Sequence, residues 1–151
     1  MFRKLSSVLA VLLVAGVTVV AADIKLEGVT CVISPRPADK EKVADYKEGK
    51  VFFCCGGCQA KFKETPKKFA VKANHQLVAT KQYVQKGCPF SGGKVDPETT
   101  LDIGGTKVAF CCAGCKSKVE MAEDDAAKMK MVFTEKAFAK GFKSAKKKET
   151  H

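Results

Sequence analysis

Short apolar runs entered from glycine-containing turns recur along the chain and predict β-strands. Lys50–Phe53 and Lys107–Phe110 are rich in β-branched and aromatic residues, as strands usually are. Each run leads directly into a segment of cysteines and glycines, after which Gln59–Glu64 and Lys116–Glu123 have helix-forming composition. The pattern predicts the same strand, tight turn and helix twice.

Apolar residues at helical spacing follow each of these segments. Thr65 and Pro66 are typical of an N-cap and a first helical residue, and they predict a helix that links the two parts. Its expected apolar positions are Phe69, Ala73, Leu77 and Val84. The lysine-rich amphipathic segment Ala126–Phe142 is expected to cover a core, and residues 143–151 are expected to form a basic disordered tail.

The N-terminal segment has the pattern of a signal peptide. Arg3 and Lys4 precede an apolar run from Val8 to Val20, and a small residue, Ala22, stands at the expected cleavage position. An uncleaved anchor is the competing interpretation, but the run is shorter than the roughly 20 apolar residues that a span needs. We expect residues 1–22 to be removed, leaving a periplasmic or secreted protein without a stable membrane span.

An internal duplication organises the rest of the chain. Cys31, Cys54, Cys55 and Cys58 recur 57 positions later, without a gap, as Cys88, Cys111, Cys112 and Cys115. Residues 31–65 and 88–122 share thirteen identities in 35 positions, and all eight cysteines are among them. We therefore divide the chain into a first unit with its linking helix at 23–86 and a second unit with a C-terminal helix at 87–142.

The charge of the chain is strongly positive, at +11 formally. Without Arg3 and Lys4, 25 basic and 16 acidic residues leave +9. Such a balance suggests nucleic-acid binding, but an exported protein rarely meets nucleic acid, and the sequence has no arginine-rich patch with interleaved aromatics. We expect solvated lysines, with attraction to anionic envelope surfaces at most.

The cysteine spacing is the strongest chemical signal. In each unit a distant cysteine joins a pair four positions apart at a helix N-terminus, which is how small domains bring thiolates to one metal ion. The helix dipole favours thiolate over thiol, and Lys50, Lys61 and their counterparts add weaker support as nearby cations. Metal ligation is therefore the leading hypothesis.

On these residues the sequence resembles the YHS and TRASH family of small metal-binding domains. The resemblance rests on Cys31 with the run Lys50–Cys58 in the first unit, and on Cys88–Gly92 with Lys107–Cys115 in the second. It implies an α+β fold of two tandem treble-clef-like units, each a β-hairpin plus a helix. It also implies a function in heavy-metal trafficking, buffering or sensing, with the metal ion and another metal-handling protein as partners. The ligands carried over from the family are Cys31, Cys54, Cys58, Cys88, Cys111 and Cys115.

The choice of metal depends on a fourth ligand. Ser34 and Ser91 stand three positions after the first cysteine of each unit, where a hydroxyl is a poor ligand. Three thiolates suit Cu(I), whereas Zn²⁺ prefers four donors, for which Cys55 and Cys112 are the candidates. We expect about one Cu(I) or Zn²⁺ per repeat. His75 is more typical of a packing or surface residue than of a ligand.

Two alternatives stay open. An exported chain with eight cysteines is also compatible with a disulfide scaffold. Cys55–Cys58 and Cys112–Cys115 have the CxxC form of thiol oxidoreductases, although each unit is too small for a thioredoxin-like scaffold. No serine–histidine arrangement, phosphate-binding loop or dinucleotide fingerprint occurs, so we expect a non-enzyme.

Overall fold

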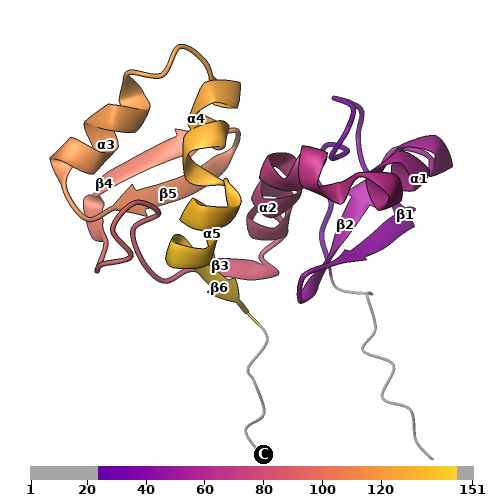
Figure 1. Ribbon diagram of the computed structural model, residues 1–151, viewed down its shortest axis with the longest axis horizontal. Helices are drawn as coiled ribbons and strands as arrows, with labels where there is room; N and C mark the ends of the chain where they lie inside the picture. The colour runs from indigo at the N-terminus through magenta and orange to yellow at the C-terminus, as the bar shows by residue number, and fades with distance from the viewer. Residues whose placement is uncertain (1–23, 146–151) are drawn as a thin grey trace, which may run out of the picture.

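A computed structural model describes residues 24–145 as two α+β units with a helix between them (Figure 1). The expected signal peptide, residues 1–22, lies outside the described residues. Within 24–145 no helix combines the length and the apolar character that crossing a membrane requires. The predicted fold class, two tandem units of a β-hairpin and a helix joined by a helix, is confirmed.

The two units repeat the same elements. The first contains β1 (Asp39–Tyr46), β2 (Gly49–Phe53) and α1 (Gly56–Glu64), and the second contains β4 (Asp96–Ile103), β5 (Thr106–Phe110) and α3 (Ala113–Glu120). Each strand pair is an antiparallel hairpin, and both strands of the second lie 57 positions after those of the first. The duplication inferred from the cysteines therefore extends to the backbone.

The acidic residues shared by the units lie in strands. Asp39, Glu41 and Asp45 belong to β1, and their counterparts belong to β4. The Asp39 carboxylate accepts a hydrogen bond from the Glu41 N–H at 2.9 Å, and both hairpins have an irregular register near this point. In both units the strand continues beyond this turn-like aspartate contact.

The linking segment contains three elements rather than one helix. It comprises η2 (Pro66–Phe69), a 3-10 helix, followed by α2 (Ala70–Ala79) and β3 (Tyr83–Gln85). Val84, predicted on the helix, lies in β3 because the helix ends at Ala79 and the chain then turns through Lys81, whose φ is +59°. The prediction of one continuous helix was therefore wrong at its C-terminal end.

The C-terminal segment is also divided. It forms α4 (Asp125–Val132), α5 (Glu135–Gly141) and β6 (Phe142–Ser144). Thr134 breaks the expected single amphipathic segment, since its side chain caps α5 by accepting a hydrogen bond from the Ala137 N–H. The tail was predicted to begin at residue 143, which is wrong, because β6 pairs with β3 and Ala145 N–H bonds to Gln82 O. Residues 146–151 lie outside the described part.

One hydrophobic core joins the two units. Helix α2 lies between them and contacts β2 of the first unit as well as α4, α5 and β5 of the second (Figure 1). Leu77 of α2 is fully buried in a cluster that includes side chains of both hairpins, such as Val51 and Val108. The units therefore share apolar burial and form one packed body.

A polar cluster around Glu135 adds to this junction. The carboxylate accepts hydrogen bonds from Tyr46 Oη at 2.8 Å and Asn74 Nδ2 at 3.2 Å, and it pairs with Lys47 Nζ. Partial burial raises the pKa of Glu135, but these donors outweigh it, and the net pKa lies below its ordinary value. The Lys47–Glu135 ion pair joins the first hairpin to α5.

Glu135→Gln should therefore lower the free energy of unfolding at neutral pH. A depressed carboxyl pKa stabilises the fold above the unfolded value of about 4.3, and this contribution disappears as pH falls through the folded pKa. We expect a loss of less than about 1 kcal/mol because the pair is partly exposed. Urea unfolding at neutral and at acidic pH measures this loss in the free energy of unfolding. Glu120→Gln, in a helical surface pair with Lys116, is the control; an equal effect of the two variants at neutral pH would refute the assignment.

Candidate metal centre

The first cysteine of each group is presented by a tight backbone loop. Cys31 N–H donates to Arg36 O at 2.8 Å, and a bridge between Thr30 and Pro37 closes the loop, here called the knuckle. The Ile33 N–H points at Cys31 Sγ, 3.4 Å away. A backbone donor aimed at the sulfur favours its thiolate form.

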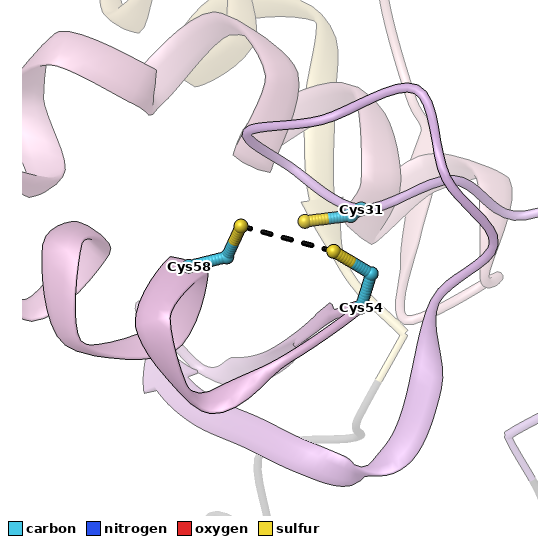
Figure 2. Close-up of side chains that lie close together, drawn as sticks. All are labelled: Cys31, Cys54 and Cys58. Carbon is cyan, nitrogen blue, oxygen red and sulfur yellow. Dashed lines mark hydrogen bonds between the residues drawn. The ribbon is translucent and has the colours of Figure 1, made fainter.

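The other two cysteines of the first group come from the end of a strand and the start of a helix. Cys54 follows β2 directly, and Cys58 is the third residue of α1. Figure 2 shows that their side chains and that of Cys31 point toward one another. The three Sγ atoms all lie within 4.8 Å of one another, with Cys54 and Cys58 3.7 Å apart. Cys31 is buried, whereas the other two are half-buried.

The second group has the same construction. Cys88, Cys111 and Cys115 have Sγ atoms within 4.8 Å of one another, and the last two are 3.7 Å apart. Its knuckle closes through a hydrogen bond from Cys88 N–H to Gly93 O at 2.9 Å. Gly87 is required there because a Cβ at this position would lie 2.6 Å from the carbonyl oxygen of Gly92.

These sulfur separations fit one metal ion per group. With a metal–sulfur bond of about 2.3 Å, sulfurs are about 3.8 Å apart around a tetrahedral ion and about 4.0 Å apart around a trigonal one. The observed 3.7 Å approaches both values, whereas a disulfide needs about 2.05 Å. All eight cysteines are free thiols in the structure. Each unit therefore contains three sulfurs that could hold a metal ion.

The thiols of the first group differ in acidity. Burial raises the pKa of Cys31, but hydrogen bonds from the backbone of Ile33, Ser34 and Cys54 outweigh it, and the net pKa is lowered. Burial, together with the neighbouring thiols, raises the pKa of Cys58 to about 12. The pKa values of these two neighbouring thiols therefore move in opposite directions.

The thiols of the second group differ in pKa in the same way, and Ser91 adds a further hydrogen bond. Burial opposes ionisation of Cys88, but backbone N–H groups and the Ser91 side chain lower its pKa to about 6. Burial and the neighbouring thiols raise the pKa of Cys115 to about 12. Ser91 Oγ also lies 3.3 Å from Cys111 Sγ as a donor. The serine is therefore not placed as a ligand but as a hydrogen-bond partner of the sulfurs.

The candidate fourth ligands lie at the edge of the groups. Cys55 Sγ is 3.8 Å from Cys54 Sγ, and Cys112 Sγ is 3.9 Å from Cys111 Sγ, but neither belongs to the three-sulfur groups. Cys112 is exposed and Cys55 is half-buried. The Cys58 N–H at the start of α1 lowers the pKa of Cys55, and Cys115 does the same for Cys112.

Other residues considered as ligands or nearby cations have structural contacts. His75 Nε2 lies 3.0 Å from Thr106 Oγ1, and the ring packs edge-on against Phe133. Burial lowers the pKa of His75, which lies outside both cysteine groups. Lys50 pairs with Asp45 at 2.9 Å. The histidine therefore packs α2 against the second hairpin, and Lys50 forms an ion pair within the first hairpin.

Comparison with protein-family models, curated proteins and solved structures finds no match. The resemblance to YHS and TRASH domains therefore rests on the sequence motifs alone. What the structure adds independently is the convergence of three sulfurs in each unit.

Metal binding should release protons and weaken with acidity. Ligation needs thiolates, whereas Cys58 and Cys115 hold their protons in the metal-free protein, so protons compete with the ion. We expect at least one proton released per unit at neutral pH, and an affinity that rises as pH increases. Calorimetry in buffers of different ionisation enthalpy counts the protons. A heat independent of buffer, with an affinity that does not change with pH, would contradict this expectation.

Proposed function

We propose that this protein is an exported metal-binding protein that takes up one soft metal ion in each unit through cysteine thiolates. The observation that carries the proposal is the convergence of three sulfurs, twice, at separations that suit one ion. A tight knuckle, a strand end and a helix start supply the three sulfurs in each case. Soft sulfur ligands select ions such as Cu(I) and Zn²⁺ over Mg²⁺ or Ca²⁺.

Cu(I) fits the proposal better than Zn²⁺. Three sulfurs converge in each unit, and Cu(I) accepts such a set, whereas structural zinc almost always has four ligands. Cys55 or Cys112 would have to move toward the group to complete a zinc site. We therefore propose Cu(I) as the preferred cargo, with Zn²⁺ as the alternative.

The edge cysteines support a role in metal transfer. Cys55 and Cys112 are more accessible than the knuckle cysteines, and each lies within 4 Å of a sulfur of its group. Such a thiolate can bind the ion as it enters or leaves, so that the metal is never released free. We propose trafficking or buffering, with another metal-handling protein as partner, in the periplasm or outside the cell, and no enzymatic activity.

The decisive experiment is metal analysis with thiol titration on the mature protein purified from its own compartment. We expect about two ions per chain, falling to about one in Cys31→Ser and in Cys88→Ser and to none in the double variant, as two separate sites require. Fully oxidised cysteines with no metal would support the disulfide scaffold instead. Turnover in an insulin-reduction assay that Cys55→Ser abolishes would support the thiol oxidoreductase.

Cys55→Ser and Cys112→Ser test the transfer role. The double variant should keep two Cu(I) ions but release them to a chelator more slowly than wild type, because the attacking or leaving thiolate is missing. Cys54→Ser, which removes a converging sulfur next to Cys55, should instead lose the ion of the first unit. Stopped-flow transfer to a chromogenic chelator measures the rate. Unchanged transfer in the double variant would contradict a role for the edge cysteines.

A further inference from the structure

Two glutamines of the linking segment make the same set of three hydrogen bonds. Gln76 makes it with the first unit and Gln85 with the second. Gln76 of α2 accepts from the Phe52 N–H at 2.7 Å and donates through Nε2 to Phe52 O at 3.0 Å and Thr30 O at 2.8 Å. Gln85 of β3 accepts from the Ala109 N–H at 2.9 Å. It donates to Ala109 O at 2.6 Å and Gly87 O at 3.0 Å.

The bonded backbone groups are equivalent in the duplication, but the glutamines are not. Phe52 and Ala109 lie 57 positions apart, as do Thr30 and Gly87. Gln76 and Gln85, in contrast, are nine positions apart in one linking segment, and phenylalanines occupy the positions 57 residues after them. The same contact is thus made twice by residues that the duplication does not relate. Inheritance from a common unit does not explain it.

The contacted residues flank the sulfurs. Thr30 immediately precedes Cys31, and Phe52 stands two positions before Cys54. A primary amide has one acceptor and two N–H donors, so it can pair with both backbone groups of one strand residue and still reach a third group. Gln76, which is almost fully buried, uses its acceptor and both its N–H donors in this way. Its hydrogen bonds link the residue before Cys31 to the strand residue two positions before Cys54.

We propose that Gln76 and Gln85 are positioning residues of the two metal centres. Each holds the knuckle cysteine of its unit at metal-binding distance from the cysteine at the strand end. The inference rests on the proposed metal binding and extends it, because one linking segment then sets the geometry of both centres. Partners that orient metal ligands typically contribute about 10- to 100-fold to affinity.

Gln82 supplies a matched control on the same strand edge. It accepts from the Lys50 N–H and donates to Lys50 O, both at 2.7 Å, and it also donates to Thr80 Oγ1. Its amide therefore pairs with β2 as that of Gln76 does but bonds to neither knuckle. A glutamine that only closes an exposed strand edge should behave like Gln82, and a positioning glutamine should not.

The test measures Cu(I) affinity in proteins that keep one centre. Cys88→Ser reports on the first unit and Cys31→Ser on the second, each in competition with a chromogenic Cu(I) chelator. We expect Gln76→Met to weaken binding about 10- to 100-fold in the first background and to leave the second unchanged, with the reverse for Gln85→Met. Gln82→Met should lower thermal stability with little effect on affinity in either.

Several outcomes would overturn the inference. Equal losses for Gln76→Met and Gln82→Met, or equal losses in both units, would reduce Gln76 to a structural residue. If Gln76→Met does not fold, Gln76→Glu keeps the acceptor for Phe52 but lacks the donors to Thr30, and wild-type affinity in that variant would refute the assignment. Failure of the proposed function itself is distinguishable, because the wild-type protein would then bind no Cu(I) before any glutamine is changed.

Discussion

In each unit three sulfurs must lie close together, although each thiol can ionise to a negatively charged thiolate. The rest of the unit depends on this constraint. Two full charges about 4 Å apart repel by about 4 kcal/mol at an effective protein dielectric constant near 20. Protons limit this repulsion in the metal-free protein: burial and the neighbouring thiols raise the pKa of Cys58, whereas backbone hydrogen bonds lower that of Cys31. A soft cation relieves it more fully, since it attracts all three sulfurs at once.

The surrounding fold supplies that convergence with very short elements. An isolated hairpin of two strands is at best marginally stable in water, and helix α1 has only one buried side chain, that of Phe62. Stability instead comes from α2, which lies between the units and lets them share one core (Figure 1). The pairing of β3 with β6 then closes the second unit against the linking segment. Duplication therefore produced one body with two centres rather than two independent domains.

The sequence could predict the features that short-range patterns encode. The strands ending at Phe53 and Phe110, the helices after them and the grouping of six cysteines follow from composition and from the repeat. The β3–β6 pair could not be predicted, because its strands are three residues long and almost 60 positions apart. Gln76 and Gln85 gave no signal either, since their equivalence exists only in the contacts that they make. Ser91 was noted as a repeated serine, but only the structure shows it beside Cys111.

We propose above all that the converging sulfurs hold a metal ion. X-ray absorption spectroscopy of the Cu(I)-loaded mature protein tests it most directly, because it counts the sulfur neighbours of the bound ion. We expect about three sulfurs per ion at roughly 2.3 Å, in wild type and in each variant that keeps one centre. A first shell of oxygen or nitrogen, or a fully reduced protein that takes up no metal, would contradict it.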